Sequence, residues 1–253
     1  MEQLLKLLKS GLAEIFLCKL IINSSKSGLR AAFFMQRLQH SKKFLENINM
    51  YKRMHNEGYK KKDGGYIDKK ESFNGISTIP YAPIIKKIIN KNKISSLLDY
   101  GCGKGEFYDK KFNLDNIEYP SFKNFWDIDI DLYDPGYAQY SKLNKNKNYD
   151  MVICIDVLEH IPIEDIDYVL EQLSNLSKKY IFLNVGCYSA AALLPNGENA
   201  HITIQKPEWW YEKILKLIKI RQNLKIICNC TIVKDGKLKV FPLQFNDKIN
   251  NYI

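Results

Sequence analysis

Arginine is scarce in this sequence: only four of its 38 basic residues are arginine, and the rest are lysine. The formal net charge of +10 would suit a nucleic-acid-binding protein. Such sites, however, favour arginine, because its planar guanidinium group makes paired contacts with phosphate and guanine. The sequence is also rich in asparagine and isoleucine, and this combination is typical of codon bias. We therefore expect solvated lysine surfaces rather than a nucleic-acid interface.

Paired cysteine motifs are absent. None of the six cysteines forms a Cys-x-x-Cys pair, so their spacing argues against a zinc site. Cys154 and Cys187 lie in apolar stretches that we interpret as buried strands. Buried free thiols are typical of a reducing compartment, so we expect a cytoplasmic protein.

Long hydrophobic runs are also absent. Residues 1–22 have apolar residues at helical spacing with lysines between them, but Glu14 and Lys19 interrupt the apolar stretches. This pattern excludes a membrane-spanning helix, and no small-residue cleavage site follows it. We favour a helix packed on the core or on a second subunit, and a membrane-surface helix is the alternative.

The rest of the N-terminal region is expected to be helical and polar. A second helix is predicted at about residues 29–56, followed by a polar loop at 58–75 and a short helix at 81–90. We divide the chain into an N-terminal helical extension or cap, residues 1–78, and a catalytic domain, residues 79–253.

A glycine-rich turn follows a short apolar strand within residues 95–105. A phosphate-binding loop of the Walker type needs Ser or Thr after Gly-Lys, but Lys104 is followed by Gly105. A dinucleotide-binding fingerprint needs a small residue where Glu106 stands, and that carboxylate would repel a pyrophosphate. What remains is an acid at the end of a strand, Asp99, followed by three spaced glycines. These are Gly101, Gly103 and Gly105.

Two further acids follow predicted strands. Residues 125–136 alternate apolar and acidic side chains, which suits a strand that ends at Asp134. An acid at this place in nucleoside-binding α/β folds hydrogen-bonds ribose hydroxyls. Residues 151–155 form an uninterrupted apolar strand, typical of a strand buried on both faces, and lead into Asp156-Val-Leu-Glu-His.

The glycine-rich turn and the Asp156-Val-Leu-Glu-His string together resemble the first and fourth motifs of the class I S-adenosylmethionine-dependent methyltransferases. The resemblance covers about residues 80–245. It implies a Rossmann-like α/β fold with a doubly wound, mostly parallel sheet of seven strands, closed by an antiparallel hairpin at residues 225–233 and 237–245. Residues 135–150 leave little room for the family's third strand, so we expect that strand to be short or missing.

The resemblance also implies where the cofactor S-adenosylmethionine binds. In the family, the first acid lies near the methionine end of the cofactor, and the glycine loop lies against it. Asp134 follows Gly101 at a longer spacing than usual, which predicts an insertion at about residues 113–123. The expected cofactor contacts are Asp99, Tyr100, Gly101, Cys102, Gly103, Gly105, Asp134, Asp156, Val157 and Leu158.

Glu159, His160 and His201 are the candidate catalytic residues. A methyl acceptor such as a sugar hydroxyl must lose a proton, and either histidine could take it or orient the acceptor. Asp156 with these three residues also resembles the metal ligands of small-RNA 2′-O-methyltransferases. We favour the metal-free interpretation, because Val-Leu-Glu-His occurs in metal-free members and an aspartate stands at the first ligand position.

We therefore expect methyl transfer to a small-molecule or saccharide acceptor, with oxygen as the acceptor atom. Three alternatives remain: an RNA methyltransferase, a cofactor-binding protein without turnover, and a nucleotide-dependent oxidoreductase, which Glu106 disfavours.

Overall fold

A computed structural model describes residues 40–243 and 245. The amphipathic segment 1–22 and the first part of the predicted helix 29–56 lie outside the described residues. Residues 41–243 and 245 belong to one compact unit. None of the helices in the described part of the chain is long and apolar enough to cross a lipid bilayer.

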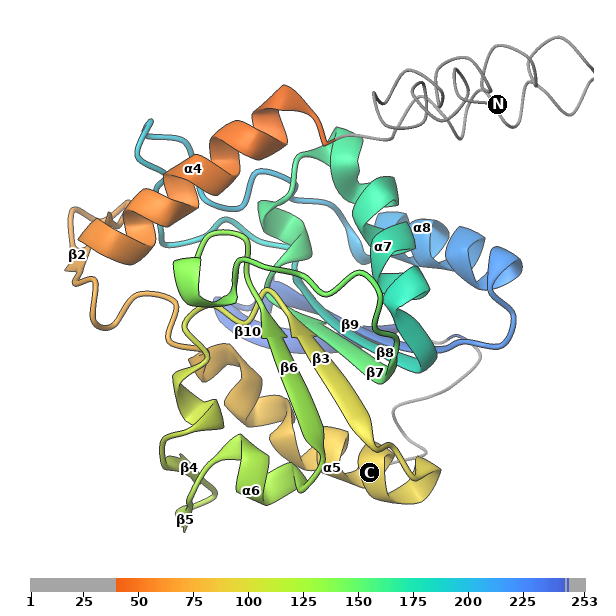
Figure 1. The fold of residues 1–253 in the computed structure, drawn as a ribbon. Helices are drawn as coiled ribbons and strands as arrows, with labels where there is room; N and C mark the ends of the chain where they lie inside the picture. The colour runs from red at the N-terminus through yellow and green to blue at the C-terminus, as the bar shows by residue number, and fades with distance from the viewer. Residues whose placement is uncertain (1–39, 244, 246–253) are drawn as a thin grey trace, which may run out of the picture. The chain divides into compact units, whose positions relative to one another are not determined.

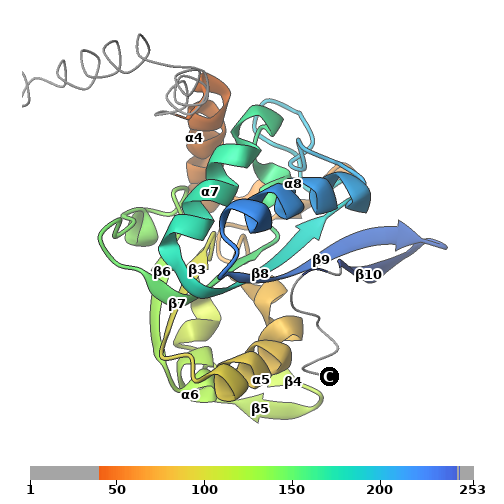
Figure 2. The same ribbon diagram turned by 90° about the vertical axis from the view of Figure 1, so that its right-hand side faces the viewer.

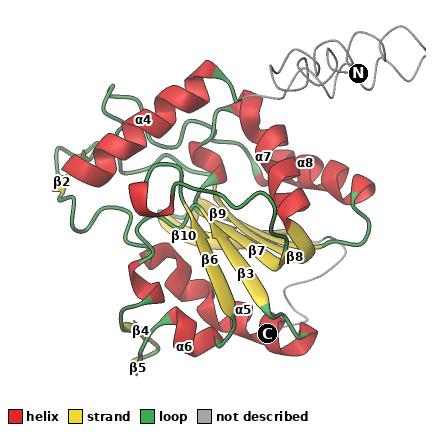
Figure 3. Cartoon of the chain, viewed as in Figure 1, coloured by secondary structure: helices red, strands yellow, loops and turns green. Residues whose placement is uncertain are grey.

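The centre of the compact unit is a six-stranded sheet with the order β10-β9-β8-β7-β3-β6 (Figure 3). Neighbouring strands are parallel except for the β9–β10 hairpin, as expected from the sequence. The strands are β3 (Ser96–Tyr100), β6 (Asp129–Tyr133), β7 (Tyr149–Ile155), β8 (Ser177–Gly186), β9 (Lys225–Lys234) and β10 (Lys237–Leu243).

The sheet therefore has one strand fewer than the seven expected, within the described residues. Between β6 and β7 the chain forms only a 3-10 turn, Ala138–Tyr140, and loops. This agrees with the expectation of a short or missing third strand. Residues 125–128 do not extend β6 as predicted, because Phe125 and Trp126 end a short helix, α6 (Phe122–Trp126).

Helices cover both faces of the sheet (Figure 2). Every residue of β7 is buried, and its side chains alternate between two cores. Val152 and Cys154 face the core under α7 (Ile166–Leu176) and α8 (Pro207–Ile220). Met151, Ile153 and Ile155 face the core over α5 (Ala82–Asn92) and α6. This two-sided burial explains the uninterrupted apolar sequence of the strand.

Smaller elements connect these parts. The expected insertion holds the hairpin β4 (Phe112–Leu114) and β5 (Ile117–Tyr119), which precedes α6. The glycine-rich turn leads only into a 3-10 turn, Glu106–Tyr108, rather than a longer helix. The polar segment after helix α4 (Lys42–Glu57) contains the two-residue strands β1 (Tyr59–Lys60) and β2 (Tyr66–Ile67). A 3-10 helix, Ile76–Tyr81, precedes α5. The turns Leu158–His160 and Ile163–Asp165 join β7 to α7.

Helix α4 (Lys42–Glu57) precedes the sheet in sequence and is anchored at its first turn (Figure 1). The Ser41 hydroxyl accepts a hydrogen bond from the Phe44 amide at 3.0 Å, which caps the helix. The same hydroxyl donates to Asp165 at 2.5 Å, and the Ser41 amide donates to that carboxylate at 2.9 Å. One serine therefore starts the helix and ties it to the segment before α7.

We predict that Ser41→Ala will loosen α4 selectively. Loss of the cap should cost about 1 kcal/mol and remove one hydrogen bond from the buried Asp165 carboxylate. Amide hydrogen exchange should become faster over residues 44–57 than in β7. The matched control is Lys42→Ala at the exposed neighbouring position. Exchange in α4 that is the same in both variants would contradict this account of the anchor.

Candidate functional site

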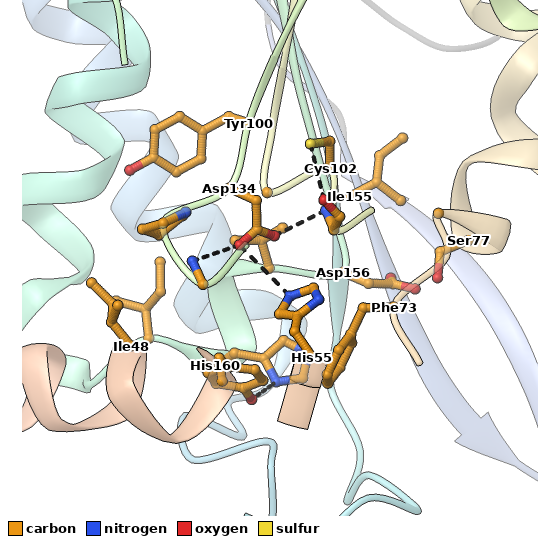
Figure 4. Close-up of a pocket in the computed structure, with 18 of the residues that line it drawn as sticks. Ile48, His55, Phe73, Ser77, Tyr100, Cys102, Asp134, Ile155, Asp156 and His160 are labelled. Atoms are coloured by element: carbon orange, nitrogen blue, oxygen red, sulfur yellow. Dashed lines mark hydrogen bonds and ion pairs between the residues drawn. The ribbon is translucent and has the colours of Figure 1, made fainter. Parts of the chain in front are cut away.

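A cavity lies at the carboxyl ends of β3, β6 and β7 (Figure 4). Its walls are the three loops that follow these strands, the segment at residues 73–78 and one face of α4. Carboxyl ends of parallel strands are where α/β folds bind their ligands. Eight of the residues expected from the sequence line it: Tyr100, Gly101, Cys102, Gly103, Asp134, Asp156, Val157 and His160.

The glycine loop after β3 is shaped by close packing. Gly101 and Gly103 both have left-handed backbone angles, with φ of 88° and 60°. A Cβ on Gly101 would overlap the Val157 side chain, and one on Gly103 would overlap the Phe73 carbonyl oxygen. Glycine is therefore required at both positions by geometry, and it leaves bare backbone at the cavity.

Asp134 ties this loop to the end of β6. Its Oδ2 accepts a hydrogen bond from the Gly103 amide at 2.9 Å, and its Oδ1 accepts one from the Gly136 amide at 2.7 Å. Burial raises the pKa of this carboxyl, and the backbone hydrogen bonds oppose that rise. The acid expected to meet a ribose thus lies in the cavity wall and also holds the loop in place.

Other expected cofactor contacts lie outside the cavity wall. Asp99 is 3% exposed and accepts a hydrogen bond from the Tyr108 hydroxyl at 2.7 Å. Burial raises the pKa of Asp99 to about 7. Gly105 and Leu158 do not line the cavity either, and Leu158 is packed in the core.

Asp156 has an unusual backbone conformation at the end of β7. Its φ of 56° is left-handed, which is strained for a residue other than glycine. The amide of Asp156 donates to the Asn184 carbonyl at 3.0 Å, and its carboxylate accepts from the Asn184 side chain at 2.6 Å. These bonds hold the strained residue so that it lines the cavity.

Glu159, His160 and His201 meet beside this cavity. Glu159 is completely buried, and its Oε1 accepts a hydrogen bond from the Gly186 amide at 2.6 Å. Its Oε2 has no hydrogen-bond partner in the described part of the chain, and burial raises its pKa well above the usual range. The His201 Nε2 lies 4.0 Å from Glu159 Oε1, and the two imidazole rings are 4.7 Å apart. The structure thus joins the three residues predicted to be catalytic.

The hydrogen bonds of the two histidines fix their tautomers. His160 Nδ1 lies 2.9 Å from the Ala200 carbonyl and 2.6 Å from the Tyr51 hydroxyl, which itself donates to Ala200. His201 Nδ1 lies 2.5 Å from the Tyr188 carbonyl. A carbonyl can only accept, so we assign the proton to Nδ1 in both residues, which leaves both Nε2 atoms unprotonated. Burial lowers the pKa of both residues, that of His160 to about 3.

The same three residues could hold a metal ion. One ligand atom from each of Glu159, His160 and His201 lies within 4.8 Å of the other two. Imidazoles that bind metals commonly donate their other N–H to a carbonyl, as both do here. Asp156, the fourth member of the expected ligand set, is not in this group and is hydrogen-bonded to Asn184 instead.

No residue of α4 was among the expected site residues, although residues 1–78 were expected to form a cap. Asn47, Tyr51 and His55 all line the cavity from this helix. His55 is 5% exposed, and its Nε2 lies 3.9 Å from Asp134 Oδ1. The four-residue spacing of these polar residues on a helix was the available signal, because it places them on one face.

Comparison with known proteins gives one match. A family model described as a methyltransferase domain matches residues 75–223, which is more than half of the chain. No curated protein and no solved structure matches the chain. The matched range includes the glycine loop, Asp134, Asp156 and the Glu159 group, and it begins after α4.

We predict that Gly101→Ala will lower the free energy of unfolding by about 2–3 kcal/mol, because it combines backbone strain with overlap on Val157. In the double variant, the added Val157→Ala should recover at least about 1 kcal/mol of that loss, because it removes the overlapping side chain. The cycle consists of the wild type, the two single variants and the double variant. Denaturant unfolding of the four proteins of this cycle measures the coupling.

The control is Gly197→Ala, since Gly197 also has a left-handed φ but no atom within 4 Å of the added Cβ. It should show only the smaller cost of backbone strain. Simple additivity of Gly101→Ala and Val157→Ala would contradict the packing argument.

Proposed function

The chain belongs to the class I S-adenosylmethionine-dependent methyltransferase family, and on this premise we propose that it methylates an oxygen atom of a small-molecule or saccharide acceptor. The enzyme uses S-adenosylmethionine as its methyl donor. The observation that carries the proposal is the neutral imidazole of His160, which is held through Nδ1 in the wall of the cavity that the glycine loop also lines. That cavity thus has a surface for a cofactor and a group suited to a hydroxyl.

The residues of the cavity fit the cofactor. Gly101 and Gly103 line the cavity with backbone alone. The Asp134 carboxylate keeps acceptor capacity for a hydroxyl group beyond its three backbone hydrogen bonds. S-adenosylmethionine supplies an activated methyl group on a sulfonium centre. The protein therefore has to bind, orient the acceptor and exclude water.

The groups proposed to act on the acceptor are His160, which lines the cavity, and its neighbours His201 and Glu159. A hydroxyl acceptor loses its proton during transfer, and His160 is unprotonated at neutral pH because burial lowers its pKa to about 3. We propose that His160 takes or orients that proton, and that His201 and Glu159, which pack beside it, help to fix its position. The strained Asp156 would fix the acceptor between the cofactor and His160.

Three features support the proposed cap and small acceptor, the cytoplasmic location, and an acceptor other than RNA. Helix α4 and residues 73–78 form part of the cavity wall, which supports the role of residues 1–78 as a cap and favours a small acceptor. The five cysteines in the described part of the chain are free thiols, which supports a reducing, cytoplasmic location. The lysine-rich composition with little arginine disfavours the RNA alternative.

The test is a transfer assay with labelled methyl donor against a metabolite extract, with release of S-adenosylhomocysteine as a second readout. We expect the label in a small molecule or saccharide. On the identified acceptor, His160→Gln should lower kcat by about 100-fold or more, with an unchanged Kd for S-adenosylhomocysteine. His40→Ala, outside the cavity wall, is the control.

Three outcomes would contradict this proposal. Label found only in RNA would support the RNA alternative. Binding of the cofactor without transfer to any acceptor would indicate a non-catalytic protein. Unchanged kcat in His160→Gln would remove the proposed role of that residue.

A second candidate is a metal-assisted form of the same reaction. It is favoured by the unpartnered Oε2 of Glu159 and by the grouping of Glu159, His160 and His201, whose ligand atoms lie within 4.8 Å of one another. A carboxylate and two imidazoles suit a divalent transition metal, which would hold and polarise the acceptor oxygen.

Chelation and cobalt binding separate these two forms. The metal-assisted form predicts that exhaustive chelation abolishes activity, that added Co²⁺ gives visible absorption, and that Glu159→Gln loses that absorption. The metal-free form predicts full activity after chelation and no Co²⁺ spectrum. His55→Gln, which leaves the Glu159 group intact, is the control for the absorption.

A further inference from the structure

Helix α4 turns a polar stripe inwards. Asn47, Tyr51 and His55 are spaced four residues apart and all line the cavity. Helices that cover a protein core normally bury apolar residues and expose polar ones, so a buried polar stripe indicates a specific role. Asn47 is 4% and His55 5% exposed. The family match begins at residue 75, so it assigns nothing to this helix.

Two members of the stripe have polar atoms without partners. Asn47 Nδ2 and His55 Nδ1 are buried and have no hydrogen-bond partner among the described residues. A buried polar atom left unsatisfied costs about 1–3 kcal/mol, so such atoms are uncommon away from functional sites. Tyr51, between them in the stripe, is satisfied by His160 and Ala200.

The imidazole of His55 is held firmly at the Asp134 end of the cavity. The ring of Phe73 lies 4.8 Å away and that of Tyr137 5.1 Å away, centroid to centroid. Burial, with a smaller effect of Lys104, lowers the pKa of His55 to about 4. The residue is therefore neutral at physiological pH, and it does not form a charged pair with Asp134.

The gap between His55 and Asp134 has the size of one oxygen atom. The 3.9 Å separation of His55 Nε2 and Asp134 Oδ1 is too long for a hydrogen bond. An oxygen about 2.8 Å from each atom closes a triangle on that base. The Asp134 carboxylate has about four acceptor sites, and the backbone amides of Gly103, Gly136 and Tyr137 use three of them, so one remains. A hydroxyl can donate to this carboxylate and also pair with the neutral imidazole.

We propose that His55 is a cofactor-binding residue that holds, together with Asp134, a ribose hydroxyl of S-adenosylmethionine. The inference rests on the proposed placement of the ribose at Asp134. It makes α4 part of the cofactor site, although this helix lies outside the matched domain. The unusual burial of a neutral histidine beside an acid then has a functional reason.

The experiment is a ligand–variant cycle by calorimetry on the full chain. The probes are S-adenosylhomocysteine and its 2′-deoxy and 3′-deoxy ribose analogues. The wild type should bind S-adenosylhomocysteine, with its intact ribose, at least about tenfold more tightly than one of the two deoxy analogues. His55→Ala should lower the affinity for S-adenosylhomocysteine by about tenfold and leave that for the same deoxy analogue nearly unchanged. The preference for the hydroxyl should therefore largely disappear.

Two further variants make the result specific. Lys52→Ala, at an exposed position of the same helix, should keep the full preference for the ribose hydroxyl. His55→Gln, which keeps a donor group at this position, should restore part of the preference and also serves if His55→Ala fails to fold. Tm values without ligand report on folding.

The outcomes separate this inference from the proposed function. If the wild type binds S-adenosylhomocysteine and a folded His55 variant retains the full hydroxyl preference, the role of His55 is overturned. If the wild type binds neither S-adenosylhomocysteine nor its analogues, the cofactor site itself is overturned.

Discussion

The structure depends on the Asp134 carboxylate, which accepts hydrogen bonds from the amides of Gly103 and Gly136. These two bonds fasten the glycine loop after β3 to the end of β6 and fix the floor of the cavity. Gly136 also lies against α4, because a Cβ there would come within 3.0 Å of Tyr51 and 3.4 Å of His55. A single partly buried acid therefore determines how the loop, the strand and the helix meet. Because the same oxygens face the cavity, the group that stabilises the site is also available to a ligand.

The site separates into two chemical halves, and α4 reaches both. Asp134 and His55 form one half, where neutral imidazole and carboxylate suit the hydroxyls of an uncharged sugar. His160, His201 and Glu159 form the other, where neutral imidazoles beside a carboxyl group suit orientation of an acceptor hydroxyl or metal binding. Tyr51 links the helix to the second half through His160. Anchoring of α4 by Ser41 and Asp165 thus bears on both cofactor binding and chemistry.

Much of this arrangement could be predicted from local sequence patterns. The apolar run of β7, the glycine turn after β3 and the proline at the start of α8 each determine their structure over a few residues. Asp99 shows a limit, because the acid expected at the cofactor is turned into the core towards Tyr108. The role of His55 depends on contacts with Phe73, Asp134 and Tyr137, which are distant in the sequence. No local periodicity encodes such contacts, although helical spacing does reveal the polar stripe.

The central claim is that the cavity beneath α4 binds the methyl donor, with its ribose at Asp134 and its sulfur towards Asp156 and His160. A crystal structure of the full chain with S-adenosylhomocysteine tests this most directly. The account predicts a ribose hydroxyl within hydrogen-bond distance of both Asp134 and His55, and the sulfur on the side of His160. A ligand bound outside this cavity, or one whose ribose lies away from Asp134, would contradict it.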